Sequence, residues 1–371
     1  MSELGVGLIG TGWMGKCHAL AWRSVQAVFG HEIVPRLEVL CDERPGEASL
    51  RAPEFGFARH ATNWSDVIAD PRVDVVSITT PNGLHHEMAV AALEAGKHVW
   101  CEKPMALTVA DAEAMAAAAG AAPGKTLLGY TYVQNPAIRQ ARSMIEAGVI
   151  GDLVHFRGQV DEDYLASPEA PWSWRSRIAT GGLGVLGDLT CHLVSFAHTL
   201  VGEIASLSAD VETIHRMRPV PGGEMREVEN EDVAHAIVRF RSGLTGVLAS
   251  SRTAWGRKNA IRVEVHGTKG TIAFDQERLN ELQLFVADGP EASRGFRTIL
   301  GGPAQPPHGR FVPAAGHQLG FNDLKVIECA HLLDCIGNGS ETWISFADGV
   351  KIERVIHGMA ASARDRQWVD L

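Results

Sequence analysis

The sequence predicts an α/β domain with a doubly wound parallel sheet, followed by an α+β domain with a large, mostly antiparallel sheet. Strand and helix patterns alternate over residues 1–131, whereas strand patterns follow one another directly over much of 132–371. Alternation places crossover helices against a parallel sheet, and strands without crossovers pair antiparallel. The chain has 371 residues, which is long enough for two such domains.

The elements predicted for residues 1–131 begin and end with strands. The run Val73–Thr80 is rich in β-branched residues, which is typical of a strand buried on both faces. Gly96 and Gly120 mark the expected ends of two helices. The predicted strands are Val6–Ile9, Leu37–Cys41, Val73–Thr80, His98–Cys101 and Thr126–Tyr130, and the helices are Gly15–Phe29, Asn82–Ala95 and Val109–Ala119.

The pattern changes after residue 131. We expect helices at Pro136–Ala147, Asp188–Leu200, Asp323–Ile336 and Asp348–Ala363, and loops over 289–320, which are rich in Gly and Pro. The strands expected to form the antiparallel sheet are Leu153–Val160, Ile204–Thr213, Val233–Arg241, Thr245–Thr253, Ala260–His266, Thr271–Phe274 and Glu281–Val286.

Composition excludes several classes of protein. The formal net charge of -10 argues against a non-specific nucleic-acid or anionic-membrane surface, because both need clustered Lys and Arg. We find no apolar run of the ~18 residues that a bilayer span needs. The first strand pattern begins near Leu4 and leaves no room for a signal peptide, so we expect a cytoplasmic protein.

The cysteines and histidines do not predict a metal site. His85 and His86 are adjacent, so on a helix their side chains point ~100° apart. No CxxC or HExxH spacing is present, and the expected state of the thiols is reduced and packed. The cysteines lie scattered at Cys17, Cys41, Cys101, Cys191, Cys329 and Cys335.

A glycine fingerprint predicts a dinucleotide site. The run Gly10-Thr11-Gly12-Trp13-Met14-Gly15 fits G-x-G-x-x-G, follows an apolar strand and opens a helix. The first glycine permits a tight turn, the second lets the backbone approach a pyrophosphate, and the third lets helix and strand pack closely. The N–H groups at the start of the helix then face the phosphates. The residues of this run, Trp13 and Met14 included, are therefore predicted cofactor contacts.

The acid that ends the second strand favours NAD over NADP. Asp42 there can accept hydrogen bonds from ribose hydroxyls and repel a 2′-phosphate. The gap from Gly15 exceeds the usual ~20 residues, which we assign to an insertion over Gly30–Arg36 before the strand. Arg44 keeps NADP open as an alternative, because an arginine nearby can bind a 2′-phosphate.

Several blocks occurring together in this order resemble the glucose–fructose oxidoreductase / inositol dehydrogenase (Gfo/Idh/MocA) family, over essentially the whole chain. The C-terminal half is most similar to the branch that includes bacterial levoglucosan dehydrogenases. The family blocks are the glycine fingerprint, Cys101-Glu102-Lys103-Pro104, the run Gly181 to His192, Thr80-Pro81-Asn82 with His85, Ser173-Trp174-Arg175 and His266 to Gly270. The branch is suggested by Gly256 to Asn259, Arg294 to Thr298 and Ser345 to Gly349.

The resemblance implies an NAD(P)-dependent dehydrogenase that acts on a CH–OH group of a sugar or cyclic polyol. Its catalytic residues would be Lys103, Asp188 and His192, which also bind substrate. The chemistry agrees, because oxidising an alcohol needs a base for the hydroxyl proton, and His192 can titrate near neutral pH. Asp188 lies four residues earlier on the same helix face. Lys103 follows a strand and can hold the reacting oxygen, and either Lys103 or His192 can be the immediate base.

The resemblance also implies further contacts. Residues Thr80, Pro81, Asn82, His85, Glu102, Lys103, Trp174 and Arg175 would bind the cofactor. Tyr132 and Glu162 are expected substrate contacts, and Gln134, Asp161, Asp163 and Tyr164 are further hydrogen-bonding candidates. An anionic Glu162 would disfavour a sugar acid. In the family, the lysine–proline bond of the Lys103-Pro104 turn is often cis.

Two other functions remain open from the sequence. An NAD-dependent glycosidase would keep the fold and cofactor but use transient oxidation, and a non-enzymatic sensor would bind NAD alone. By analogy with the family we expect a homodimer or homotetramer, with residues 1–131 binding NAD and 132–371 binding substrate and forming the oligomer. Leu282, Leu284 and Val286 alternate with polar residues, as a half-buried strand does.

Overall fold

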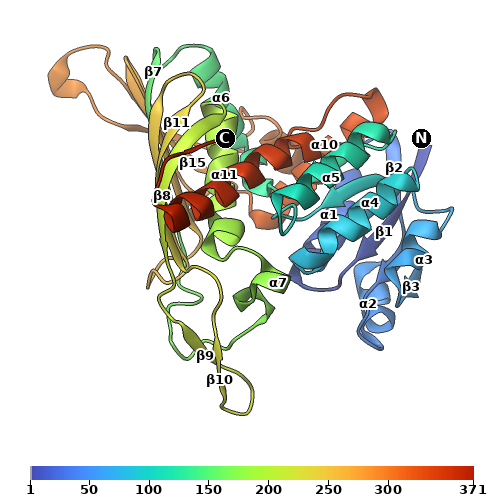
Figure 1. Ribbon diagram of the computed structural model, residues 1–371. Coiled ribbons are helices and arrows are strands. Elements are labelled where there is room, and N and C mark those ends of the chain that lie inside the picture. Colours follow the sequence, from blue (N-terminus) through green and yellow to red (C-terminus); the bar gives the residue numbers. More distant parts are fainter. Residues whose placement is uncertain (1) are drawn as a thin grey trace. The chain divides into compact units, whose positions relative to one another are not determined.

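The computed structural model describes residues 2–371, which form two compact units (Figure 1). Unit 1 contains the chain up to Thr131 together with Gly320–Val350, and unit 2 contains Tyr132–Leu319 and Lys351–Leu371. The sequence predicts the change at residue 131. It does not predict the return of Gly320–Val350 to unit 1, since we assigned all residues from 132 onward to the second domain.

The sheet of unit 1 is parallel throughout, in the order β3-β2-β1-β4-β5-β6. This order confirms the predicted doubly wound fold, and it reverses between β1 and β4, where such sheets bind ligands beyond the carboxyl ends of the strands. Every residue of β4 is buried, as predicted for a strand covered on both faces. The strands are β1 Ser2–Ile9, β2 Ile33–Cys41, β3 Arg59–Ala61, β4 Val75–Ile78, β5 His98–Cys101 and β6 Thr126–Leu128.

Unit 1 also contains helices that the sequence predicts only in part. Gly120 does not end a helix, because α5 continues through it to Ala121. The strand β2 starts at Ile33, so the extra residues before Asp42 lengthen the strand rather than form a separate insertion. The helices are α1 Trp13–Phe29, α2 Glu47–Phe55, α3 Trp64–Ala69, α4 His85–Glu94 after a 3-10 turn at Asn82–Leu84, α5 Val109–Ala121, α10 Phe321–Asn338 and the start of α11 Phe346–Asp365.

Unit 2 is built on a nine-stranded sheet in the order β16-β15-β14-β13-β7-β12-β11-β8-β17. All neighbouring strands pair antiparallel except β7 and β12, which confirms the mostly antiparallel sheet. The strands are β7 Leu153–Asp161, β8 Ile204–Glu212, β11 Val233–Phe240, β12 Thr245–Ser251, β13 Ala260–Gly267, β14 Gly270–Asp275, β15 Glu281–Val286, β16 Arg297–Leu300 and β17 Val369–Asp370.

One face of this sheet packs against α8, and the opposite face is open. Alternate residues of β11 are buried and exposed, as a strand covered on one side requires. Helix α8 Cys191–Leu200 contacts β7 and β13 on the buried face. The remaining elements are α6 Pro136–Glu146, α7 Ile178–Gly181, a π-helical turn at Leu186–Thr190, α9 His308–Phe311 and the hairpin of β9 Met217–Pro219 with β10 Met225–Glu227.

The segment Ile178–Leu200 is apolar and long enough to cross a bilayer, which our search for apolar runs did not reveal. Its most apolar window is 72% buried inside the protein. The segment consists of α7, the π-helical turn and α8, and all but two residues of α8 are buried. Its hydrophobicity is therefore that of a core segment in unit 2.

Candidate active site

The glycine loop that follows β1 is shaped to approach a ligand. Gly10 has a φ of 101°, and a Cβ on it would lie 2.8 Å from the Thr79 carbonyl oxygen. A Cβ on Gly15 would lie 2.1 Å from the carbonyl oxygen of Gly10, so helix and strand pack closely here. At Gly12, by contrast, a Cβ would meet nothing within 4 Å. The open space lies at the start of α1, where backbone N–H groups attract phosphate, so the loop fits a dinucleotide.

The end of β2 carries a tightly bound carboxylate. Asp42 accepts hydrogen bonds from the Thr11 N–H at 3.1 Å and its hydroxyl at 2.6 Å, and from Arg44 Nε at 2.8 Å and Nη2 at 2.9 Å. Burial opposes ionisation of Asp42, but these hydrogen bonds outweigh it and hold its pKa well below the usual range. The side chain of Arg44 is 60% exposed. The acid and the arginine therefore act as one ion-paired unit beside the glycine loop.

His85 connects two of the loops at the carboxyl edge of the sheet. Its side chain is wholly buried, with Nδ1 at 2.9 Å from the Pro104 carbonyl oxygen and Nε2 at 3.0 Å from that of Thr80. Burial lowers its pKa. The Lys103-Pro104 peptide bond is cis and Lys103 is half-buried, as is Asn82, whereas Pro81 is exposed. His85 thus links the loop of Thr80 to the loop of Lys103 and Pro104.

Glu102 belongs to a buried network of charged side chains in unit 1. One of its carboxylate oxygens accepts from Lys325 Nζ at 2.5 Å and lies 2.8 Å from His18 Nε2. Lys325 also donates to Glu328 at 2.8 Å, and Glu328 accepts from the Thr131 hydroxyl at 2.5 Å. The side chain of Glu102 therefore points into the core of unit 1. The predicted contact of Glu102 with the cofactor ribose stays a prediction.

The four ionisable groups of this network have shifted pKa values. Burial lowers the pKa of His18 to about 4, which leaves the imidazole neutral at physiological pH. Burial opposes the charge on Glu102 and Lys325, but their mutual attraction lowers the pKa of the acid and raises that of the lysine. Burial and the charge of Glu102 raise the pKa of Glu328 to about 7. The network therefore holds one firm ion pair and one carboxyl that titrates near neutrality.

Our sequence reasoning missed His18, Lys325 and Glu328. Lys325 and Glu328 stand three residues apart in α10, whose other residues from Leu324 to Leu333 are almost all buried and apolar. A Lys and a Glu three residues apart on an otherwise apolar helix could have indicated a buried ion pair, since charged residues are rarely buried unless they are paired. Glu102, the partner of Lys325, lies more than two hundred positions earlier in the chain, and the sequence around it does not indicate this contact.

In unit 2 the structure brings Asp188 and Tyr164 together. Tyr164 follows β7, and its hydroxyl donates a hydrogen bond to Asp188 Oδ2 at 2.6 Å. Asp188 lies in the π-helical turn Leu186–Thr190 rather than in regular helix as predicted. Single π-helical turns are frequent at functional sites because they redirect side chains. Tyr164, which the sequence offered only as a further candidate, is thus a direct partner of a predicted catalytic residue.

His192, the second residue of α8, is buried next to Tyr132. The two rings meet edge to face, with 4.8 Å between their centroids and 63° between their planes. The Tyr132 hydroxyl accepts a hydrogen bond from Asn259 Nδ2 at 2.9 Å. Asn259 has a φ of 53°, in the left-handed region that asparagine tolerates better than most residues. These contacts orient the imidazole and place two predicted site residues, His192 and Tyr132, side by side.

The acidic cluster at the end of β7 makes several contacts within the protein. Asp163 accepts from Lys258 Nζ at 2.6 Å and from the Gly256 N–H at 3.0 Å. Asp161 accepts from Gln159 at 2.5 Å, and burial raises its pKa. Gln134 is buried and accepts from Arg139 at 2.6 Å. Asp161, Asp163 and Gln134 therefore bind within the protein, while Glu162, between the two acids, stays a predicted substrate contact.

Trp174 and Arg175 lie together in a 3-10 turn, Trp174–Ser176. The Arg175 guanidinium stacks over the Trp174 ring at 4.4 Å from its centroid. Asn230 fixes the turn by donating to the Arg175 carbonyl oxygen at 2.7 Å. The turn is ordered by unit 2 itself, and its predicted contact with the cofactor stays a prediction.

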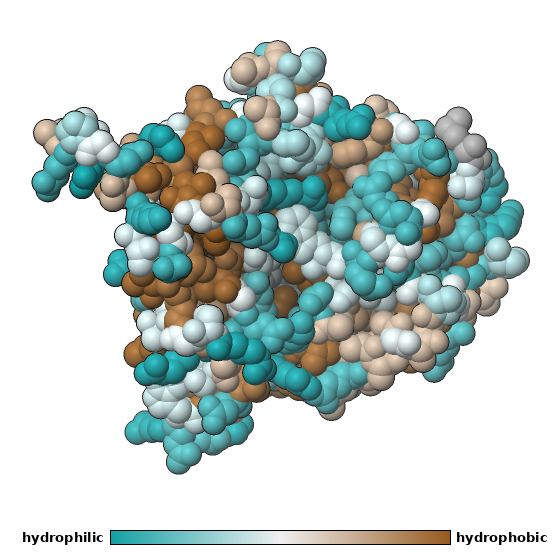
Figure 2. Space-filling model, turned by 90° about the horizontal axis from the view of Figure 1, so that it is seen from above, coloured by the Kyte–Doolittle hydropathy of each residue, from teal (hydrophilic) through white to brown (hydrophobic). Residues whose placement is uncertain are grey.

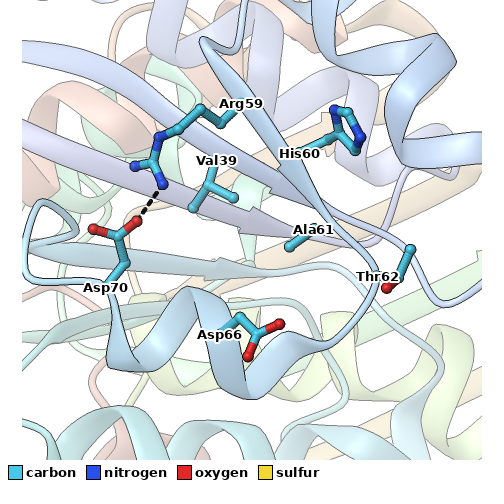
Figure 3. Close-up of a pocket in the computed structure, with 7 residues that line it drawn as sticks. All are labelled: Val39, Arg59, His60, Ala61, Thr62, Asp66 and Asp70. Carbon is cyan, nitrogen blue, oxygen red and sulfur yellow. Dashed lines mark hydrogen bonds and ion pairs between the residues drawn. The ribbon is translucent and has the colours of Figure 1, made fainter.

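A shallow pocket of about 370 Å³ lies elsewhere in unit 1, between β2, β3 and α3 (Figure 3). Its lining includes none of the predicted site residues, and Arg59 and Asp70 in its wall form an ion pair with each other. Among residues 2–371 no group of three or more His, Cys, Asp or Glu side chains is placed to hold a metal ion. The candidate chemistry therefore rests on the loops and side chains described above.

Comparisons with known proteins agree with this description. Family models match residues 4–130, as the oxidoreductase family with an NAD-binding Rossmann fold, and residues 138–273, as the GFO/IDH/MocA C-terminal domain. Levoglucosan dehydrogenase of Pseudarthrobacter phenanthrenivorans is 37% identical over 100% of this chain and 99% of its own. D-apiose dehydrogenase of Paraburkholderia graminis is 27% identical, over 98% of this chain and 88% of its own.

Solved structures give the same result. A levoglucosan dehydrogenase in complex with NADH and levoglucosan has a TM-score of 0.96 at 37% identity, covering 100% of this chain and 99% of its own. An NAD-binding oxidoreductase from Klebsiella pneumoniae also has a TM-score of 0.96, at 40% identity and the same coverage. The resemblance predicted from the sequence blocks is confirmed, and the chain belongs to the Gfo/Idh/MocA family of NAD-binding oxidoreductases.

Proposed function

We propose that the protein oxidises a secondary hydroxyl of a sugar, an anhydrosugar or an inositol-type polyol and transfers the hydride to NAD. The observation that carries the proposal is the pair Asp188 and His192, a carboxylate in the π-helical turn and an imidazole at the start of the mostly buried helix α8 that follows it. Burying polar side chains costs free energy, and a role as base for a hydroxyl proton explains why they are present here.

NAD, when bound, supplies the hydride acceptor. The open space at Gly12 and the N–H groups that begin α1 would hold its pyrophosphate, with Trp13 and Met14 beside them. Asp42, fixed by Thr11, would accept hydrogen bonds from the adenosine ribose and disfavour a 2′-phosphate. The loop of Thr80, Pro81 and Asn82, supported by His85, would contact the rest of the cofactor.

Three residues divide the work of proton transfer in this proposal. Lys103, half-buried after β5, holds the reacting oxygen and stabilises the negative charge that develops on it. His192, oriented by Tyr132, exchanges the hydroxyl proton. Asp188 binds a substrate hydroxyl or the imidazolium of His192. Lys103 and His192 share the proton, so removal of either slows the chemical step.

The substrate class rests on relatives. Levoglucosan dehydrogenase is 37% identical over the full chain, and a myo-inositol 2-dehydrogenase of Thermotoga maritima is 27% identical over 78% of it. Tyr132 and Glu162 are the proposed polar contacts to substrate hydroxyls. Because Glu162 is an acid, we expect neutral or amino sugars to be preferred over sugar acids.

The surroundings of the enzyme follow from two further features. All six cysteines are free, which supports a reducing compartment, and we infer the cytoplasm. Figure 2 shows a hydrophobic area in the region of the nine-stranded sheet. On the open face of that sheet Ile237 is 54% exposed and Val247, its register partner, 39%. We infer a homodimer or homotetramer that covers this face.

The experiment that tests the function is sustained NADH formation with a panel of levoglucosan, inositols and aldoses, with NAD and NADP in parallel. We expect turnover with NAD and at least one member of the panel, and a loss of at least about 100-fold in kcat for Lys103→Ala. Lys97→Ala, a lysine on the opposite edge of the same sheet, is the matched control. No turnover despite NAD binding would contradict the proposal and favour the glycosidase or the sensor.

A further inference from the structure

We propose that Tyr164 is a positioning residue that fixes the carboxylate of Asp188 for proton transfer. The inference rests on the proposed function, in which Asp188 assists His192. The observation behind it is the hydrogen bond from the Tyr164 hydroxyl to Asp188 Oδ2, at 2.6 Å. A hydrogen bond of this length to a carboxylate is of the strong, charge-assisted kind.

The loop that carries Tyr164 is held by a buried arginine. Arg218, on β9, is 0% exposed, and its guanidinium donates to the carbonyl oxygens of Leu165 at 2.7 Å, Ser167 at 2.9 Å and Ala170 at 3.4 Å. Burying a guanidinium is costly unless its donors are used. Here the two terminal nitrogens, Nη1 and Nη2, both donate to the backbone of one loop. These bonds hold the loop that carries Tyr164, although 40% of the surface of Tyr164 is exposed.

The turn that carries Asp188 is anchored independently. The Leu186 N–H donates to the Glu231 carboxylate at 3.0 Å, and the Val185 N–H donates to the Glu231 carbonyl oxygen at 2.9 Å. On the other side of the turn, the Thr190 and Ser250 hydroxyls lie 2.5 Å apart. Both partners of the Tyr164–Asp188 bond are therefore set by buried contacts of their own, which distinguishes it from a chance contact between mobile surface side chains.

The charges around Tyr164 keep its hydroxyl protonated. The phenol end of Tyr164 is largely shielded from water although part of the residue is exposed. This desolvation and the neighbouring Asp188 carboxylate raise the pKa of Tyr164 well above its ordinary value. Glu162 acts in the same direction, and Arg252, behind the loop, opposes it. The phenol is therefore a donor throughout the physiological pH range. A donor to a carboxylate favours its ionised form, which is the form that can orient an imidazole or accept from a substrate hydroxyl.

Two consequences separate a positioning role from simple substrate binding. Without the phenol, the Asp188 carboxylate is free to rotate and is protonated more readily. We therefore expect kcat to fall, and the acidic limb of the pH–kcat profile, where protonation of Asp188 ends its support of His192, to move to higher pH. A tyrosine that only bound a substrate hydroxyl would change KM and leave that limb in place.

The experiment compares Tyr164→Phe with the unaltered enzyme and with Trp255→Phe, a control at an exposed aromatic residue of the adjoining loop. We expect Tyr164→Phe to lose about 10- to 100-fold in kcat, with KM nearly unchanged and the acidic limb at higher pH. Trp255→Phe should match the unaltered enzyme. A change confined to KM, or kinetics like those of the control, would overturn the inference.

A second measurement does not need turnover. The chain has three tyrosines, so tyrosine labelled with 13C at Cζ gives three resonances, and the one missing from Tyr164→Phe is assigned directly. Because the Asp188 charge raises the pKa of Tyr164, this resonance should titrate at lower pH in Asp188→Asn. An unchanged titration would overturn the inference. If Asp188→Asn shifts the titration of Tyr164 but the unaltered enzyme oxidises no polyol, the proposed function is overturned and the contact between Tyr164 and Asp188 is not.

Discussion

Asp42 is fixed in place by the residues around it rather than by its own strand. Thr11, in the glycine loop, and Arg44, two positions further on, both donate to its carboxylate. Arg44 contacts Asp42 directly and is exposed, so it could donate to a 2′-phosphate if the acid were removed. The preference for NAD is therefore set by the balance between one acid and one arginine.

Asp42→Asn should relax the choice of cofactor. The variant removes the negative charge while leaving an oxygen for Thr11, and it releases Arg44 from its ion pair. We expect the ratio of kcat/KM for NADP to that for NAD to rise by at least about tenfold, which corresponds to ~1.4 kcal/mol. Steady-state kinetics with both cofactors measure it. Glu43→Gln, at the exposed neighbouring acid, is the control, and an unchanged ratio in Asp42→Asn would contradict this role.

Single residues show how far the sequence could be interpreted. The glycine fingerprint was recognisable because each glycine answers a local backbone need, and the structure shows these needs at Gly10 and Gly15. Glu102 and His85 were predicted as cofactor contacts from the family resemblance alone, and their side chains are buried. Their orientation depends on partners distant in sequence, Lys325 for Glu102 and Pro104 for His85, which no local pattern reveals.

At the scale of elements, α10 supplies part of the core of unit 1. It packs against α1 and carries Lys325 and Glu328 into the core beside Glu102. The ammonium of Lys325 also lies 5.4 Å from the centroid of the Trp100 ring, on which the His18 ring stacks at 3.8 Å. Helix α10 thus fixes the strand end that leads into Lys103.

Lys325→Met should destabilise unit 1 severely. The variant leaves the Glu102 carboxylate buried without its ammonium, and breaking one side of a buried ion pair costs about 3–5 kcal/mol. We expect a large fall in the thermal midpoint by differential scanning calorimetry. Lys125→Met removes the lysine of a more exposed pair with Glu341 and should cost only about 0–1 kcal/mol. Equal midpoints for the two variants would contradict the account.

Glu328→Gln should change how stability depends on pH. Because the pKa of Glu328 is raised to about 7 in the folded protein, its contribution is complete below the unfolded pKa of about 4.3 and is lost as pH rises to about 7. We expect the stability of the variant relative to the unaltered protein to rise across this window. Thermal midpoints at several pH values between these limits measure it.

The variant must be compared with the unaltered protein because His18 changes stability with pH in the opposite direction. Burial lowers the pKa of His18 to about 4, so its contribution to stability rises with pH over part of the same window, in both proteins. The difference between the two midpoint curves isolates Glu328. Glu341→Gln, at an exposed acid, controls for a general charge effect, and parallel curves for Glu328→Gln would contradict the shifted pKa.

The elements that the sequence predicts well have strong periodic patterns. The strands β5 and β15 have the predicted bounds, because clear breaks flank each apolar run. The short elements α2, β3 and α3 were missed, and so were β16 and α9 within residues predicted as loops. Three- and four-residue elements such as β3 and α9 are too short to show a period, and the contacts that form them come from neighbouring strands and turns.

At the scale of the whole molecule, the open face of the nine-stranded sheet determines assembly in our proposal. Ile237 on β11 and Val247 on β12 stand opposite each other, and Arg157 and Glu264 continue the same row across β7 and β13. This face carries an apolar pair with a positive and a negative side chain beside it. In a twofold contact between two copies, the positive side chain of one copy can meet the negative side chain of the other while the apolar residues pack together.

The double variant Ile237→Glu with Val247→Glu should dissociate the oligomer. Like charges placed at the centre of a twofold interface repel each other and are costly to desolvate. Multi-angle light scattering should then give one chain mass for the variant and two or four for the unaltered protein. Leu50→Glu, at an exposed leucine on α2, is the control and should leave the mass unchanged. A single-chain mass for the unaltered protein would contradict the assembly.

The central claim is that hydride passes from a carbon of a polyol to NAD and leaves with the cofactor. We would incubate the enzyme with NAD and a polyol deuterated at its hydroxyl-bearing carbons, and analyse the released cofactor by mass spectrometry. The account predicts reduced cofactor carrying one deuterium per turnover, with the label lost together with activity in Lys103→Ala. Unlabelled cofactor, or cleaved glycoside products without net reduction of NAD, would contradict it.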